Sequence, residues 1–333
     1  MVKDRLLHID LIKGFAILLV VMGHIFVFTF QLESCLLQQI IASFHMPLFM
    51  FLSGYMVLSA NKLSFNKNLK RKFVALILPF LTMGGLYVAI MNYSIHSLFF
   101  SEMKVGFWFV WVLFLLFCLY YPLHSLSLRF NDSKKWYIDL MLFGSVGIAL
   151  ETIRILGLLP DILSGFISLR QLSAFYRFFV MGMFCRKYIE LNICLHSNNM
   201  AYTIMLLLYG LCFIANIYGH GNYMTIWGVG IAGVWCAYYF FYRYQAQLPL
   251  SRIMAFVGKR SLDIYLLHYF FLMRLETIPP YLLKYINKNI AIQIFISLLL
   301  ASLIIVISLT VGQVVRSSNI LAMICLGIRK NNK

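Results

Sequence analysis

The stretch IKGFAILLVVMGHIFVFTF, residues 12–30, is long and apolar enough to cross a membrane as a helix. Lys13 lies at its start and His24 lies inside it. On an α-helix these two side chains are about 20° apart around the axis and about 16 Å apart along it. Asp10 falls within about 40° of the same face. Because an ionisable group in hydrocarbon is costly, this face is predicted to line a polar cavity inside a helical bundle.

The composition indicates an integral membrane protein. Hydrophobic residues make up 62% of the chain and charged residues only 12%, whereas soluble domains carry about 25% charged residues. The net charge of +17 does not indicate a nucleic-acid partner, because the cations gather at the ends of apolar runs, as they do next to membrane lipid. The seven cysteines are scattered without a CxxC pair, which predicts neither a metal site nor a disulfide.

The apolar runs predict an all-α, polytopic bundle of about ten membrane helices. The runs are residues 12–30, 44–60, 73–91, 107–124, 136–150, 172–185, 200–217, 223–241, 261–274 and 291–314. The fifth, sixth and ninth runs are short, so a half-membrane or re-entrant helix is an alternative there. We expect one membrane domain over residues 1–333, with a cytoplasmic leader at 1–11 and a cytoplasmic tail at 315–333.

The distribution of lysine and arginine predicts the orientation. With the N-terminus inside and ten crossings, the inner connections and tail receive 21 basic residues and the outer connections six. Inner loops of membrane proteins carry the excess of such residues. The chain is therefore expected to be a multi-pass protein of the inner (cytoplasmic) membrane, with both termini in the cytoplasm.

The loop NKLSFNKNLKRK, residues 61–72, gathers five cations before the third apolar run. One interpretation is a topology signal in contact with anionic headgroups. The other is a cytoplasmic mouth that binds a polyanion such as the phosphates of coenzyme A. Both interpretations stay open from the loop alone.

Polar residues within the other runs also have two interpretations each. His45, in SFHMPLFMFLSGYM at residues 43–56, is either an interfacial histidine bonded to backbone or a functional group. Arg177 either extends to the membrane surface or pairs with a carboxylate or a ligand phosphate. In GKRSLDIYLLH, residues 258–268, Ser261 is expected to cap a helix on which Tyr265 and His268 share a face.

Together these segments resemble the acyltransferase-3 family of integral membrane acyltransferases. The matching pieces occur in the family's order and cover most of the chain. They are RLLHIDLIKGFAILLVVMGH (5–24), FHMPLFMFLSGY (44–55), RKFVALILPF (71–80), FWF (107–109), FFVMGMFCRK (178–187) and VGKRSLDIYLLH (257–268).

The resemblance implies transfer of an acyl group, usually acetyl from acetyl-CoA, to a hydroxyl of a cell-envelope carbohydrate or glycolipid. Lys13 and His24 occupy the positions of the family's basic residue and histidine, with lysine where arginine is common. Arg71 and Lys72 fit the first part of a paired-arginine motif, and Ala75 stands where its second arginine is expected.

A neutral imidazole is suited to take the proton of an attacking hydroxyl at cellular pH, so His24 is predicted to be the general base. Asp10 is a second catalytic candidate, and its role as a partner of His24 is left open. Lys13, Arg71 and Lys72 are predicted to bind the coenzyme. Candidates for acceptor binding or proton transfer are His45, Arg177, Tyr265 and His268.

No Cys or Ser lies in a recognisable nucleophile setting, which favours direct transfer over a covalent intermediate. Two other classes stay open from the residues alone. The first is an exporter or flippase of a polysaccharide or lipid-linked sugar, because intramembrane His, Lys and Asp also suit a proton relay. The second is a membrane partner protein without catalysis.

Overall fold

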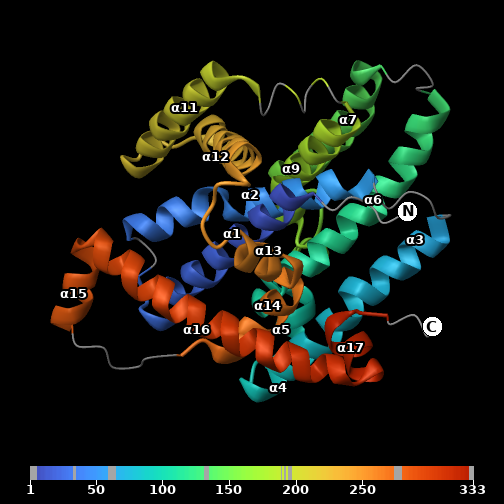
Figure 1. The fold of residues 1–333 in the computed structure, drawn as a ribbon. Coiled ribbons are helices and arrows are strands. Elements are labelled where there is room, and N and C mark those ends of the chain that lie inside the picture. Colours follow the sequence, from blue (N-terminus) through green and yellow to red (C-terminus); the bar gives the residue numbers. More distant parts are fainter. Residues whose placement is uncertain are drawn as a thin grey trace. The chain divides into compact units, whose positions relative to one another are not determined.

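The structure, a computed structural model, describes residues 6–32, 35–58, 65–130, 135–188, 190, 193, 197–273 and 280–329. Residues 1–5 of the expected leader, Lys62 of the basic loop, Cys194 and the last residues of the tail, 330–333, lie outside that part. Every regular element in the described part is a helix, which confirms the all-α class (Figure 1).

Among the described residues, seven helices are long and apolar enough to cross a membrane. They are Leu7–Thr29, Leu36–Val57, Phe65–Ile90, Trp108–Phe130, Asn199–Ile217, Tyr223–Tyr244 and Ile290–Ser317. The chain is therefore a multi-pass membrane protein, and the expected count of ten is not confirmed.

The fifth, sixth and ninth apolar runs are the ones that fall outside these seven. The fifth run forms α7 (Trp136–Ile155) and the sixth forms α9 (Leu169–Lys187). The ninth forms α14 (Ser261–Leu267), a helix of under two turns, followed by the 3₁₀ turn η6 (His268–Phe271). Ser261 is the first residue of α14 and not its cap, since the N-cap position is Arg260.

The described residues form two compact units. The first comprises Met1–Leu52 and Ile189–Gly312, and the second comprises Ser53–Tyr188 and Gln313–Lys333. α2 (Leu36–Val57) and α16 (Ile290–Ser317) contribute residues to both. The first unit also contains α1 (Leu7–His24), η1 (Ile25–Thr29), α11 (Asn199–Ile217), α12 (Tyr223–Tyr244), α13 (Ser251–Lys259), α14, η6 and α15 (Pro280–Lys288).

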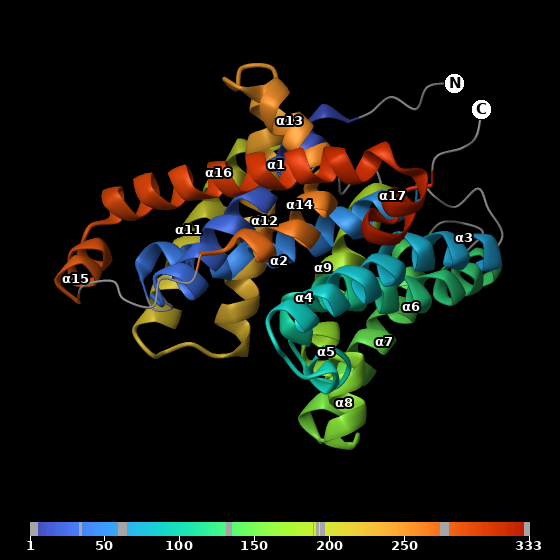
Figure 2. The ribbon, with the colours of Figure 1, turned by 90° about the horizontal axis from the view of Figure 1, so that it is seen from below.

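The second unit contains the remaining elements. They are α3 (Phe65–Lys72), η3 (Phe73–Ile77), η4 (Phe80–Gly84), α4 (Gly85–Ile90), α5 (Ile95–Phe100), η5 (Lys104–Gly106), α6 (Trp108–Phe130), α7, α8 (Asp161–Ile167), α9 and α17 (Asn319–Leu326). In it, α3 runs alongside α6 (Figures 1 and 2).

In the first unit, α1 and α13 pack with almost no space between their backbones. A Cβ at Gly258 would lie 1.9 Å from the carbonyl oxygen of Asp10, and one at Gly14 would lie 2.2 Å from that of Met254. Small residues allow such close approach, which is how helices associate where lipid removes the hydrophobic drive. The contact anchors α1, and with it the face that carries His24.

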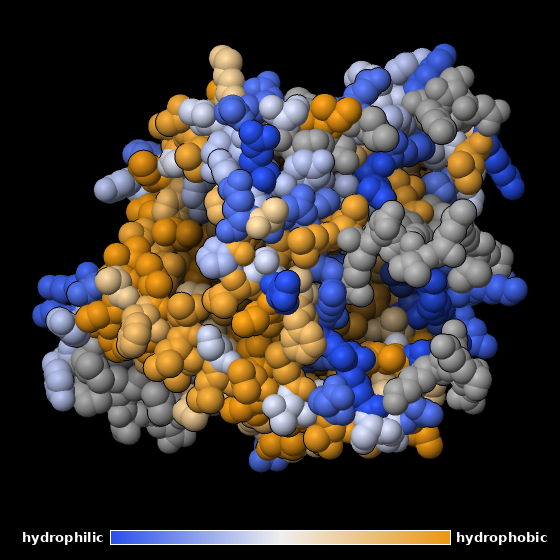
Figure 3. Space-filling model, in the orientation of Figure 1, coloured by the Kyte–Doolittle hydropathy of each residue, from blue (hydrophilic) through white to orange (hydrophobic). Residues whose placement is uncertain are grey.

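Large apolar side chains lie exposed on helices of the first unit. On α11 and α16, for example, Met200 is 74% exposed, Leu211 68% and Phe295 68%. Apolar residues dominate much of the face shown in Figure 3. Exposed apolar area on this scale is unsuited to water and matches a lipid environment.

α2 begins eight residues earlier than the expected run at 44, so Pro47 lies inside the helix rather than near its start. The preceding residues are mostly apolar and continue the helical pattern. Proline removes one backbone hydrogen bond within the helix. Next to it, His45 Nδ1 contacts the carbonyl oxygen of Ile41 at 2.7 Å.

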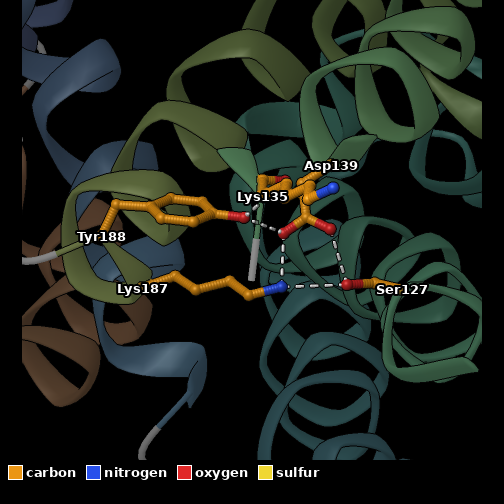
Figure 4. A network of polar contacts seen from close by, with 5 residues as sticks. All are labelled: Ser127, Lys135, Asp139, Lys187 and Tyr188. Carbon is orange, nitrogen blue, oxygen red and sulfur yellow. Dashed lines mark hydrogen bonds and ion pairs between the residues drawn. The ribbon is translucent and has the colours of Figure 1, made fainter. Parts of the chain in front are cut away.

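The second unit holds a buried polar network at the junction of α6, α7 and α9 (Figure 4). Asp139 has no exposed surface and pairs with the ammonium of Lys187. Its carboxylate also accepts hydrogen bonds from the hydroxyls of Ser127 and Tyr188, each at 2.7 Å. Lys187 donates in addition to Ser127 at 2.9 Å. The charge of Asp139 is thus satisfied on several sides, as a buried carboxylate requires.

Lys104, one of the six basic residues that the ten-helix prediction places in the outer connections, is fully buried. Its ammonium donates to the carbonyl oxygens of Phe99, Ser101 and Gly165 at 2.7, 3.2 and 2.8 Å. Burial lowers the pKa of this ammonium to about 8, whereas three acceptors favour its charged form. The side chain therefore ties the loop after α5 to α8 and is a structural cation.

Part of the expected tail, residues 319–326, forms α17, which packs against the third apolar segment. Gly327 ends α17 with φ 66°, and a Cβ there would lie 2.6 Å from the Cα of Ala75. Thr82 donates to the carbonyl oxygen of Ile324 at 2.6 Å.

Replacing Gly258 by alanine should lower the melting temperature of the purified protein in detergent, because the added methyl meets the backbone of α1. Overpacking of this kind costs about 1–3 kcal/mol. Gly210→Ala, on α11 where a Cβ meets nothing within 4 Å, is the matched control and should be neutral or mildly stabilising. Equal melting temperatures for both variants would contradict the described α1–α13 contact.

Breaking the buried ion pair should be more damaging than removing it. Asp139→Leu or Lys187→Met alone leaves an uncompensated buried charge, which costs about 3–5 kcal/mol, whereas the double variant should recover most of that loss. Chemical denaturation in detergent measures the three free energies of unfolding, with Arg129→Met at an exposed site as the control. A double variant that loses as much as the two single variants together would be inconsistent with the pairing.

Candidate functional site

His24 lies where the first membrane helix changes its geometry. α1 ends at His24, and the chain continues in the π-helical turn η1. Such turns inside a helix occur frequently at functional sites. His24 is partly exposed, although Gly23 and Ile25 on either side of it are buried. His24 is therefore a partly exposed position on an otherwise packed stretch of helix.

His268 lies at a second change of helix type, where α14 ends and the 3₁₀ turn η6 begins. It belongs to the same compact unit as His24. Unlike His24, it has no exposed surface. Its Nδ1 contacts the carbonyl oxygens of Ile264 at 3.0 Å and of Tyr265 at 2.8 Å.

The two histidine rings are in direct contact. His24 Nδ1 lies 2.8 Å from His268 Nε2. The ring planes differ by 9° and the centroids are 5.1 Å apart, close to the largest separation that so short a contact between two imidazoles permits. The rings therefore meet edge to edge in nearly one plane, which is the geometry of a hydrogen bond along the nitrogen lone pair.

The other nitrogen of His24 has a hydroxyl neighbour. The oxygen of Tyr269, from η6, lies 3.3 Å from His24 Nε2, and the ring of Phe28 lies against His24 with centroids 5.6 Å apart. His45 interacts electrostatically with His24. An imidazole held in this way can accept a proton from a hydroxyl at neutral pH.

Two further candidates lie on α1 itself. Asp10 is buried beside α13, about 21 Å from His24 along the helix axis. This distance rules out a hydrogen bond between them. Lys13 is partly exposed on the same helix. Of the two candidates in α14 and η6, Tyr265 contributes its carbonyl oxygen to His268.

The remaining candidates belong to the second unit. Arg71 is exposed at the end of α3. The ammonium of Lys72 lies 3.7 Å from the ring centroid of Phe117, a cation–π contact that also holds this side chain in place. Arg177 Nε donates to the carbonyl oxygen of Ala174 at 2.8 Å, and the side chain interacts electrostatically with Glu151.

A groove in the second unit adjoins the cations of α3. It is lined by Asn66, Leu69, Lys70, Phe73 and Phe114. Its walls are mainly apolar and aromatic, with one ammonium. Such a lining suits a ligand that has both an apolar portion and an anionic group.

Sequence reasoning missed Tyr269 and the Asp139 network. Tyr269 directly follows His268, so the only signal was its position. Asp139 had a clearer signal, because a carboxylate within an apolar run requires a partner. Among the described residues, no group of three or more His, Cys, Asp or Glu side chains is arranged to hold a metal ion.

The family model described as an acyltransferase domain matches residues 6–312. No curated protein and no solved structure matches the chain. The matched range includes the first membrane helix with His24 and the C-terminal segment with His268. It extends over nearly the whole chain, and the chain therefore belongs to the acyltransferase-3 family of membrane acyltransferases.

Proposed function

We propose that this membrane acyltransferase moves an acetyl group from acetyl-CoA to a hydroxyl of a cell-envelope carbohydrate or glycolipid, with His24 as the general base. The observation that carries the proposal is the imidazole of His24, a partly exposed residue, held edge to edge against a buried second imidazole. A ring fixed in this way is preorganised for proton transfer.

The chemistry requires a base. A sugar hydroxyl attacks a thioester poorly unless its proton is removed as the new bond forms. In the proposed step the hydroxyl oxygen bonds to the acetyl carbonyl carbon while its proton passes to His24. The carbon–sulfur bond then breaks, and the proton moves to the sulfur of coenzyme A. The products are the acetyl ester and free coenzyme A, and the base is regenerated.

The second unit offers residues that fit an anionic, partly apolar donor. α3 carries Lys67, Lys70, Arg71 and Lys72 and has no acidic residue. Its groove combines Lys70 with the rings of Phe73 and Phe114. Cationic side chains bind phosphates through charge-assisted hydrogen bonds. We assign the phosphates of coenzyme A to this helix, with exposed Arg71 as the principal contact.

Lys13 is assigned to the donor as well, because it lies on the helix that carries His24 and is partly exposed. His45 and Arg177 are assigned to the acceptor or to proton transfer. If the chain crosses the membrane ten times, as its apolar runs predict, the charge distribution supports an inner-membrane location with both termini in the cytoplasm, where acetyl-CoA is available.

Replacing His24 by alanine should abolish acetyl transfer, because the reaction then lacks its base. A general base contributes about 10²–10⁴-fold to the rate. Purified protein given radiolabelled acetyl-CoA and envelope glycan extract measures ester formation, with protein abundance in the membrane measured in parallel. His220→Ala, at an exposed loop position, is the matched control and should retain full activity. A fully active His24→Ala variant would remove His24 from the mechanism.

The same reaction, run with the protein reconstituted into sealed vesicles, separates an enzyme from an exporter or flippase. Labelled acetyl groups that appear on the glycan support the acyltransferase. Transmembrane movement of the glycan without use of acetyl-CoA would contradict the proposal.

Arg71→Ala should raise the KM for acetyl-CoA by about tenfold or more while kcat changes little, because a charge-assisted phosphate contact is worth about 1.5–3 kcal/mol. Steady-state kinetics at varied acetyl-CoA concentration measure both constants. Lys284→Ala removes an exposed cation of α15 and should leave the KM unchanged. An equal KM for the wild type and Arg71→Ala would exclude Arg71 from the donor site.

A further inference from the structure

We infer that His268 is a positioning residue that holds His24 in the tautomer with its proton on Nδ1, so that the lone pair of Nε2 is directed to the reactants. The inference rests on the proposed function of His24. The hydrogen-bond partners of the two rings support it, first those of buried His268 and then those of His24.

The contacts of His268 Nδ1 fix the protonation of this ring. This nitrogen faces two carbonyl oxygens, those of Ile264 and Tyr265, at 3.0 and 2.8 Å. Carbonyl oxygens only accept hydrogen bonds, so Nδ1 must carry a proton. The ring has no exposed surface, and burying a charged imidazole is unfavourable. A neutral His268 protonated on Nδ1 has its lone pair on Nε2.

The contact between the rings then fixes the second tautomer. His268 Nε2 accepts, so His24 Nδ1, 2.8 Å away, must donate. The coplanar, edge-to-edge arrangement directs that N–H along the lone pair of His268. His24 is consequently protonated on Nδ1, and its Nε2 is the basic nitrogen. The hydroxyl of Tyr269 lies 3.3 Å from Nε2 and can donate to it in the unliganded protein. Because Nε2 has a single lone pair, the acceptor hydroxyl takes the place of this contact when it binds.

The opposite arrangement is disfavoured by the same contacts. With the proton of His24 on Nε2, His24 Nδ1 would accept from Nε2–H of His268. The lone pair of His268 Nδ1 would then face the oxygens of Ile264 and Tyr265 with no proton between them. An unsatisfied, buried contact of this kind is destabilising.

Exposure assigns the two rings different roles. His24 is partly exposed and can touch a reactant, whereas His268 is fully buried behind it and Tyr269 is only 3% exposed. His268 therefore acts through His24. Its task corresponds to that of the third group in a catalytic triad, which holds the base in the correct tautomer and orientation. Here the orienting group is neutral.

The test compares three replacements of His268 that differ in whether an acceptor reaches His24. Glutamine places an amide oxygen near the position of Nε2, asparagine is one methylene shorter, and leucine has no acceptor. We expect kcat to fall on the order of 10²-fold for His268→Leu and His268→Asn, below the ~10⁴-fold effect of a charged orienting group. His268→Gln should stay within about tenfold of the wild type, a rescue that a purely structural role would not produce. Melting temperature and membrane abundance are measured for each variant.

A spectroscopic readout reports the tautomer without relying on activity. In protein labelled with ¹⁵N at histidine, the signals of His24 are assigned by their loss in His24→Gln. We expect Nδ1 of His24 to be protonated in the wild type, in His268→Gln and in Tyr269→Phe, which keeps the His268 contact. In His268→Leu the proton should move toward Nε2, the nitrogen that free histidine favours.

The outcomes separate this inference from the proposed function. A wild-type His24 protonated on Nε2, or a tautomer unchanged in His268→Leu, would overturn the inference even if His24 is the base. Acetyl transfer retained by His24→Ala would overturn the proposed function, and the nitrogen signals would still decide whether His268 sets the tautomer.

Discussion

The hydrogen bond between His24 and His268 is the interaction on which the rest of this account depends. It joins residues 244 positions apart in the chain and places both at points where an α-helix changes to another helix type. The contact therefore depends on two irregular helix ends that the surrounding packing holds in place. It also depends on an apolar environment, in which the hydrogen bond is stronger and one proton position is favoured.

The packing of α1 supplies the rigidity for this contact. Gly14 and Gly258 bring the backbones of α1 and α13 into direct contact, and the sequence leads from α13 straight into α14 and His268. In the second unit the Asp139 network ties three helices together with a fully satisfied carboxylate. The glycine contact and the Asp139 network both hold helices together through small or polar residues. Within lipid the hydrophobic effect does not drive helices to associate, so contacts of this kind are needed.

Much of the helical architecture was predictable from the sequence, because long apolar runs have few alternatives in a membrane. The fifth, sixth and ninth runs, which are not among the seven candidate membrane helices, are also the three short runs of the sequence. His24 was predictable because it is an ionisable residue within such a run. His268 was also a candidate, but its contact with His24 was not predictable, since a contact over this chain distance depends on tertiary packing. Asp10 was a catalytic candidate because it lies on nearly the same helical face as His24, but about 21 Å of helix separates the two residues.

The most direct measurement of the central claim is an experimental structure with a non-hydrolysable acetyl-CoA analogue and an acceptor sugar bound. We predict an acceptor hydroxyl within about 3 Å of His24 Nε2, with the acyl carbon about 3–3.5 Å from that hydroxyl oxygen. An acyl group and acceptor bound together at a place remote from His24 would contradict it.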